Sequence, residues 1–259
     1  MQLRFLFALS FTLLSISAVA CFAAPSGAGA EGPAAVAVVE LFTSEGCSSC
    51  PPADALLREI NLKQASAGQL IVGISEHVTY WDNLGWKDPY SAAVFTERQN
   101  VYALRLSGEG PYTPQMVVNG RDQFVGSDDG ALERALRDDA RRDHLALSIV
   151  SSSATASGVD VRFAVAGHLQ KPLDIVAVLT DDTDQSNVLR GENNGRLLQH
   201  VSVARSLTRV ATIKEDVEES IHVPLPDGFQ LGGGSGHHLI LFAQEPLQGA
   251  IVGAATMPL

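Results

Sequence analysis

Two cysteines separated by two serines form the group in this sequence best suited to chemistry. Cys47-Ser48-Ser49-Cys50 follows the buried-strand pattern of residues 36–42 and precedes Pro51-Pro52, which suit a first helical turn. A helix N-terminus stabilises an anion, so we expect a lowered pKa and a larger thiolate fraction at Cys47. Cys50 can then attack a mixed disulfide on Cys47 and release the substrate. The pair therefore predicts thiol–disulfide exchange, with Cys47 as nucleophile and Cys50 as resolving thiol.

Other uses of the two cysteines stay open. A structural disulfide is one, although so short a loop restricts the unfolded chain little. Half of a zinc site is another, but zinc prefers four ligands and the sequence has only three cysteines. A copper-binding protein or metallochaperone would use the same thiols as soft ligands, together with His77 or Met116. The last alternative is a redox-inert adaptor whose C-terminal half does the binding.

The elements around the pair are expected in the order β-α-β-α-β-β-α. The predicted strands are 36–42, 69–75, 116–118 and 123–125, and the predicted helices begin at Pro51 and cover 91–107 and 128–142. From His144 onward the pattern becomes polar–apolar alternation, with strands expected at 160–166, 173–179, 197–210, 220–223, 238–242 and 250–254. We therefore expect an α/β domain over 34–142 and an all-β, sandwich-like domain over 143–259.

The CxxC at the start of a helix, with a Thr113-Pro114 step before the third strand, resembles the thioredoxin superfamily. More narrowly, four stretches resemble an exported thioredoxin-like family, domain-of-unknown-function family 1223: residues 39–54, 77–89, 112–116 and 190–196. The resemblance implies a thioredoxin-like first domain with a cis Pro114 that packs against the disulfide and presents the backbone of Thr113 to substrate. It also implies that Glu40, mid-strand, relays a proton to Cys50. The alternative is a carboxylate satisfied by backbone or lysine.

An aromatic loop follows the second predicted strand. His77, Tyr80, Trp81 and Trp86 are expected to form a lid or recognition surface over Cys47, or else a small aromatic core that holds the loop down. Gly46 stands where thioredoxins carry a tryptophan, which favours a restricted partner, either a protein or a small thiol or disulfide. Glu45 is expected in solvent. The charged turn 190–196 either docks onto the first domain or a partner, or is simply a structured turn.

The N-terminal residues resemble a targeting signal. A short positive start, an apolar stretch and Ala18-Val19-Ala20 predict a signal peptide over 1–24, followed by a flexible tether over 25–33. The apolar stretch is short for a membrane span. We expect a periplasmic or secreted protein in an oxidising compartment, with lipid anchoring at Cys21 or a retained signal anchor as alternatives.

Composition restricts the partners further. Eighteen Lys and Arg against 29 Asp and Glu give a net charge of −11, which argues against a nucleic-acid partner. No phosphate-binding loop and no metal-ligand pattern stands out, so we expect neither an organic cofactor nor a bound metal. The C-terminal half offers no catalytic constellation.

Overall fold

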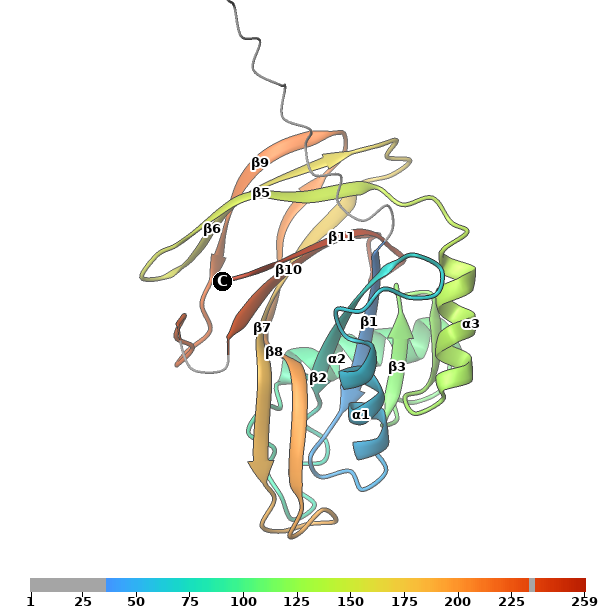
Figure 1. Ribbon diagram of the computed structural model, residues 1–259, viewed down its shortest axis with the longest axis vertical. Coiled ribbons are helices and arrows are strands. Elements are labelled where there is room, and N and C mark those ends of the chain that lie inside the picture. Colours follow the sequence, from blue (N-terminus) through green and yellow to red (C-terminus); the bar gives the residue numbers. More distant parts are fainter. Residues whose placement is uncertain (1–35, 233–235) are drawn as a thin grey trace, which may run out of the picture. The chain divides into compact units, whose positions relative to one another are not determined.

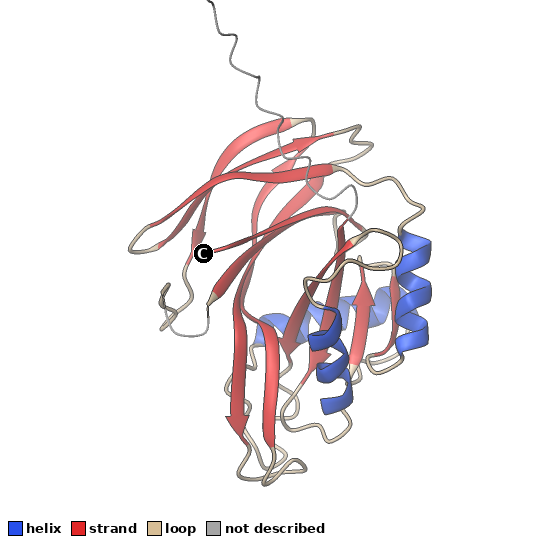
Figure 2. Ribbon diagram, viewed as in Figure 1, coloured by secondary structure: helices blue, strands red, loops and turns tan. Residues whose placement is uncertain are grey.

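The computed structural model describes residues 36–232 and 236–259, which all belong to one compact unit. Strands dominate this unit (Figures 1 and 2). None of its helices is long and apolar enough to cross a membrane. The predicted signal peptide, the tether and Cys21 lie outside the described residues.

The largest element is a mixed eight-stranded sheet in the order β11-β10-β7-β8-β2-β1-β3-β4. Its first four strands in the chain are β1 (Val36–Thr43), β2 (Leu70–His77), β3 (Gln115–Val118) and β4 (Asp122–Val125). The other four are β7 (Leu173–Asn187), β8 (Leu197–Ile213), β10 (His237–Gln244) and β11 (Ile251–Pro258). β1 and β2 are parallel, and β8 joins the free edge of β2 through the parallel pair Ser75 and Val203.

Helices cover both faces of this sheet around β1. On one face, α1 (Pro51–Ile60) and α3 (Asp129–Asp139) place Leu57, Leu132 and Leu136 against Val39 and Leu41. On the other face, α2 (Ala93–Tyr102) continues as a π-helical turn, η1 (Ala103–Ser107). Phe95 of α2 packs there among side chains of β1, β2, β7 and β10, namely Val38, Ile74, Val178 and Phe242. Alternate residues of β1 therefore point to opposite faces, as the period of a strand requires.

A second, three-stranded sheet packs against the β7–β10 part of the first. It has the order β5-β6-β9, from β5 (Ala146–Ala154), β6 (Gly158–Ala166) and β9 (Val217–Pro224). Val161 and Phe163 of β6 meet Ile175 and Leu241 in a common apolar core. This core is built entirely from the C-terminal half of the chain.

The predicted fold class is wrong. Strands β7, β8, β10 and β11 do not close a separate sandwich behind a thioredoxin-like domain, because they continue the sheet begun by β1–β4. The reason is the long β7–β8 hairpin, which covers the edge that β2 would otherwise leave unpaired. One apolar core consequently contains both Val38 and Phe242.

Candidate active site around Cys47 and Cys50

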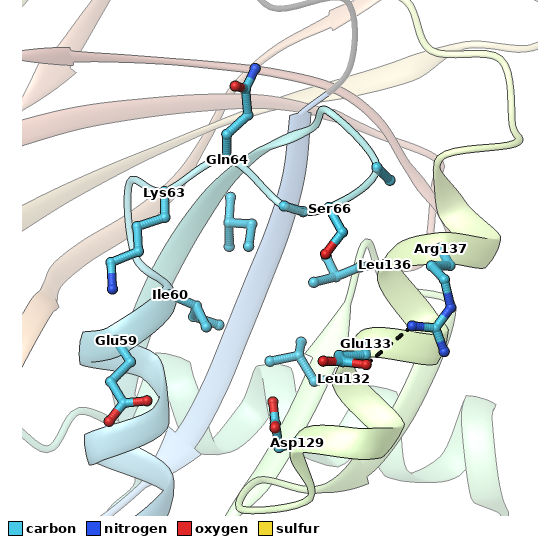
Figure 3. A pocket seen from close by; sticks show the side chains of 13 residues that line it. Glu59, Ile60, Lys63, Gln64, Ser66, Asp129, Leu132, Glu133, Leu136 and Arg137 are labelled. Atoms are coloured by element: carbon cyan, nitrogen blue, oxygen red, sulfur yellow. Dashed lines mark hydrogen bonds and ion pairs between the residues drawn. The ribbon is translucent and has the colours of Figure 1, made fainter.

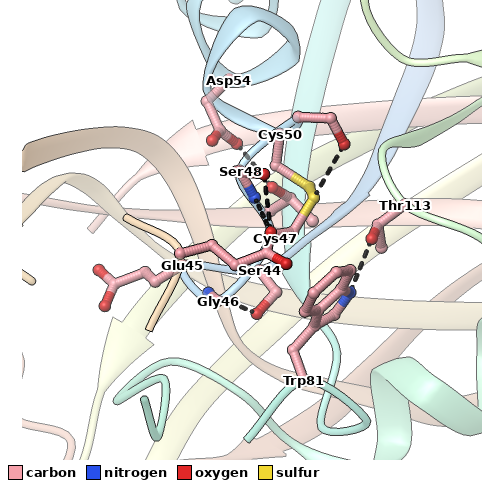
Figure 4. Close-up of a disulfide and its surroundings, with 12 residues drawn as sticks. Ser44, Glu45, Gly46, Cys47, Ser48, Cys50, Asp54, Trp81 and Thr113 are labelled. Carbon is pink, nitrogen blue, oxygen red and sulfur yellow. Dashed lines mark hydrogen bonds between the residues drawn. A yellow bond between two sulfur atoms is a disulfide. The ribbon is translucent and has the colours of Figure 1, made fainter. Parts of the chain in front are cut away.

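The two cysteines lie between the end of β1 and the start of α1. Cys47 and Cys50 form a disulfide, and Cys50 is the N-cap residue of α1 (Figure 4). The loop is tight because the N–H of Cys47 donates to the carbonyl of Ser44 and that of Cys50 to the carbonyl of Cys47. Both cysteines are fully buried, whereas Ser48 and Ser49 between them are exposed. The sulfur atoms thus lie just beneath an exposed pair of serines.

Thr113 and Trp81 flank one side of the disulfide loop (Figure 4). The indole N–H of Trp81 donates to the hydroxyl of Thr113 at 2.8 Å. The Thr113–Pro114 peptide bond is cis, and Pro114 is buried. Gly46 lets Trp81 pack against the disulfide loop, because a Cβ at position 46 would lie only 3.0 Å from the Cβ of Trp81.

A carboxylate–histidine cluster lies on the other side of the loop. It consists of Glu45, Asp54, His77, Asp88 and His200, all buried. His77 Nδ1 lies 2.7 Å from Asp88, and His200 Nε2 lies 3.3 Å from Glu45. His200 Nδ1 lies 4.0 Å from Asp54, which also accepts a hydrogen bond from Thr43. The cluster therefore joins the CxxC loop to α1, to the aromatic loop and to β8.

Burial and mutual charge perturb the pKa values in this cluster. Burial raises the pKa of Asp54 above 3.8, and the neighbouring histidines only partly oppose it. Burial alone would lower the pKa of His77, but Asp88, Asp54 and Glu45 outweigh it and raise the pKa above 6.5. Burial alone would raise the pKa of Asp88, but His77 and backbone N–H donors lower it. Asp54 lies one helical turn after Cys50, on the same face of α1. It is thus a buried acid whose raised pKa makes it lose its proton less readily than a free carboxyl does.

The tip of the β7–β8 hairpin closes over the disulfide loop; we use "hairpin tip" for residues 188–196. The side-chain amide of the fully buried Asn193 donates to the carbonyls of Glu45 and Cys47, both at 2.9 Å. The exposed carboxylate of Glu192 accepts hydrogen bonds from the N–H and the hydroxyl of Ser48, at 3.1 and 2.7 Å. The charged turn 190–196 was expected either to dock or to be simply a structured turn, and in the structure it docks onto the disulfide loop.

Glu40 lies elsewhere. It projects from β1 on the α2 face, where Arg98 donates to it at 2.5 Å and the hydroxyl of Tyr102 at 2.7 Å. Cys50 begins α1, which packs on the opposite face. The proton-relay interpretation of Glu40 therefore lacks geometric support. The carboxylate is satisfied inside the core, by an arginine and a tyrosine rather than by backbone or lysine.

The aromatic loop is packed down beside the disulfide loop. Trp81 is half-buried and contacts Phe42 and Val78, and Trp86 is half-buried with its indole N–H 2.7 Å from Glu45. His77 is the buried last residue of β2, so only Tyr80 of the four expected surface residues is exposed, at 37%. Trp81 thus packs against an apolar cluster and Trp86 against a buried carboxylate, while Tyr80 remains at the surface.

Sequence reasoning missed several residues of this site. Glu45 was expected in solvent and is fully buried instead, between Trp86 and His200. Asp54 and His200 gave no signal of their own, because an Asp in a first helical turn and a His in an alternating strand are both ordinary. Asn193 could be found only through the motif that contains it.

Two further observations bear on ligands. Within residues 36–232 and 236–259, no three His, Cys, Asp or Glu side chains are arranged to hold a metal ion. Of the possible copper ligands, Met116 lies in the core with Leu41 and His77 is held by Asp88.

A cavity of about 200 Å³ lies at the far end of α1, between Ile60 and Leu132 (Figure 3). It is remote from the disulfide, and we assign it no role in the chemistry.

Comparisons with known proteins give a family but no activity. The sequence profile of the family described as "Protein of unknown function (DUF1223)" matches residues 38–244. No curated protein matches the chain. Among solved structures, the chain is similar to the X-ray structure of a protein from Agrobacterium tumefaciens, with 28% sequence identity and a TM-score of 0.62. That alignment covers 86% of this chain and 94% of the other.

Proposed function

The chain belongs to the DUF1223 family of proteins of unknown function, and we propose that it carries out thiol–disulfide exchange with a restricted set of partners. The observation that carries this proposal is the Cys47–Cys50 disulfide, placed at the N-terminus of α1 with the exposed Ser48 and Ser49 between its cysteines. A helix N-terminus favours a thiolate, which is the reactive form of a cysteine.

The reaction consists of two displacements. A partner thiolate attacks Cys47 Sγ, the Cys47–Cys50 bond breaks, and its electron pair leaves on Cys50 Sγ. A second partner thiolate then attacks the partner sulfur bound to Cys47 and releases the Cys47 thiolate. The partner loses two electrons and becomes a disulfide, while the protein gains them as two thiols. In the opposite direction, Cys47 attacks a partner disulfide and Cys50 resolves the mixed disulfide.

Proton transfer at Cys50 is assigned to Asp54 in place of Glu40. Asp54 follows Cys50 by one helical turn, is buried, and has a pKa raised by that burial. A buried acid with a raised pKa keeps its proton to a higher pH than a free carboxyl does, which suits it to give and take a proton at Cys50. The hydroxyl of Ser49, 3.4 Å from Cys47 Sγ, is placed to donate to the Cys47 thiolate.

The surroundings of the disulfide argue for a restricted partner. Both sulfur-bearing residues are buried, and Trp81, Thr113 and the hairpin tip surround the loop. We assign Thr113 and Pro114 to the side on which the partner docks. We further propose that the protein works in the periplasm or outside the cell, because its N-terminal sequence resembles a secretory signal and disulfides persist in oxidising compartments.

Cysteine variants test the proposal. Reduced wild-type protein, C47S and C50S are each incubated with a small aromatic disulfide, and the products are identified by intact-mass spectrometry. Wild type should complete the exchange and recover its own disulfide, C50S should accumulate a mixed disulfide at Cys47, and C47S should exchange much more slowly. A C47S protein as fast as wild type overturns the assignment. Tight Cu(I) binding by the reduced protein without any exchange overturns the function itself.

A further inference from the structure

The hairpin tip carries three exposed charged residues, Arg190, Glu192 and Arg196, and it is Glu192 that contacts Ser48, the residue that follows Cys47. Glu192 Oε2 accepts from both the N–H and the hydroxyl of Ser48, and the Glu192 side chain is otherwise in solvent. These two hydrogen bonds lower the pKa of Glu192 below 4.5, so the group is ionised at neutral pH. Any molecule that approaches the disulfide from the Ser48 side meets this carboxylate.

The position of the tip is well defined. Asn193 anchors it through the carbonyls of Glu45 and Cys47. Gly191, at φ +75°, lies against the aromatic loop so closely that a Cβ on Gly85 would be 3.3 Å from its Cα. The backbone on either side of Glu192 is thus held in place, by the aromatic loop at Gly191 and by the disulfide loop at Asn193.

We propose that Glu192 is a specificity-determining residue of the exchange reaction and selects against thiols that carry negative charge next to their sulfur. The proposal rests on the proposed function, since it concerns which thiols reach Cys47. The attacking species is itself a thiolate, so an additional carboxylate on the same molecule brings a second negative charge toward Glu192. Partners with a neutral or basic surface around their cysteine are favoured.

The expected size of the effect follows from Coulomb's law. Two unit charges about 6 Å apart in water repel by an amount that changes a rate about threefold, and more where protein excludes solvent. Salt at about 1 M shortens the screening length to roughly 3 Å and should remove most of the discrimination. The effect is therefore modest, dependent on salt and specific for charge.

Three thiols of similar size and different charge test this inference: cysteamine, 2-mercaptoethanol and 3-mercaptopropionate. Each reduces the oxidised wild-type protein and the Glu192→Gln variant at pH 8, and rapid alkylation with mass spectrometry follows the loss of the disulfide. Glutamine keeps the shape of the side chain and an oxygen that can accept from Ser48, so the substitution removes mainly the charge. Relative to 2-mercaptoethanol, the ratio of variant to wild-type rate should be about threefold larger for mercaptopropionate and about threefold smaller for cysteamine.

The control is Glu97→Gln, which removes an exposed carboxylate from α2, the helix on the opposite face from α1. It should give the same ratio for all three thiols. The inference is overturned if Glu192→Gln gives equal ratios for the three thiols, or if 1 M NaCl leaves unequal ratios unchanged. If no thiol reduces the wild-type disulfide in the native protein, the proposed function itself fails, and this result is distinct from the other two.

Discussion

The side-chain amide of Asn193 donates a 2.9 Å hydrogen bond to the backbone carbonyl of Cys47, across 146 positions of sequence. The same amide nitrogen donates to Glu45, so one buried side chain ties the β7–β8 hairpin to the disulfide loop. The C-terminal half therefore contributes to the candidate active site directly and is not a separate appendage.

Asn193→Ala should make the disulfide easier to reduce and the protein less stable. The substitution leaves two buried carbonyls without their donor, at a cost of about 1–3 kcal/mol in the free energy of unfolding. If the tip must open before attack, a loss of one or two kcal/mol raises the open population, and with it the rate of reduction by dithiothreitol, roughly 5- to 30-fold. Reduction followed by alkylation and mass spectrometry measures this rate. Asn194→Ala, at the exposed neighbouring position, is the matched control and should change neither quantity appreciably.

The two tryptophans should differ in their effect on stability. Trp86 donates to Glu45, a buried carboxylate, whereas Trp81 donates to the hydroxyl of Thr113. Trp86→Phe should lower the free energy of unfolding by about 1.5–3 kcal/mol, and Trp81→Phe by about 0.5–1.5 kcal/mol. Urea denaturation of the two variants provides the comparison. A larger loss for Trp81→Phe would mean that the bond to Glu45 contributes little.

The His77–Asp88 pair should make stability depend on pH. The pKa of Asp88 is lowered, so its contribution is present above 3.8 and is lost as the pH falls through the lowered value. The pKa of His77 is raised, so its contribution is complete below 6.5 and is lost as the pH rises through the raised value. Asp88→Asn should therefore cost more at pH 5.5 than at pH 9, as measured by urea unfolding. An equal cost at both values would show that the charge of His77 does not change between them and would contradict this prediction.

The two buried acids on the α2 face, Glu40 and Glu76, should differ in how much stability an amide substitution costs. Glu40→Gln breaks a buried pair with Arg98 and should cost about 3–5 kcal/mol. Both oxygens of Glu76 are buried without a hydrogen-bond partner, and burial together with Glu40 raises its pKa well above 4.5, which favours the protonated, uncharged form. Glu76→Gln should change the free energy of unfolding by only about 1 kcal/mol. Chemical denaturation at pH 7 compares the variants, and equal losses would show that Glu76 is ionised.

Local patterns in the sequence predicted the elements more reliably than their arrangement. Proline in the first turn located the start of α1, and apolar runs located β1 and β2, because these signals lie within a few residues of what they specify. Polar–apolar alternation indicated β7 and β8 as strands but could not indicate a partner. Whether β8 pairs with a strand of its own half or with the free edge of β2 depends on contacts far apart in the sequence, so the fold class was mispredicted.

The same distinction holds for the site. The cysteines and Thr113-Pro114 could be identified because each lies in a short motif. Glu45 and His200 could not, because their environment comes from residues up to 155 positions away in the chain. Glu40 was misassigned for a related reason, since a strand pattern shows that a residue is buried but not which face it occupies relative to α1.

The reduction potential of the Cys47–Cys50 pair tests the central claim most directly. The native protein is equilibrated in a series of dithiothreitol or glutathione redox buffers, the thiols are trapped by alkylation, and the reduced fraction is read by mass spectrometry. Exchange predicts a reversible two-electron transition without denaturant, with both cysteines reduced together at a potential above about −300 mV. A potential below that value, or reduction only after unfolding, would identify a structural disulfide and contradict the account.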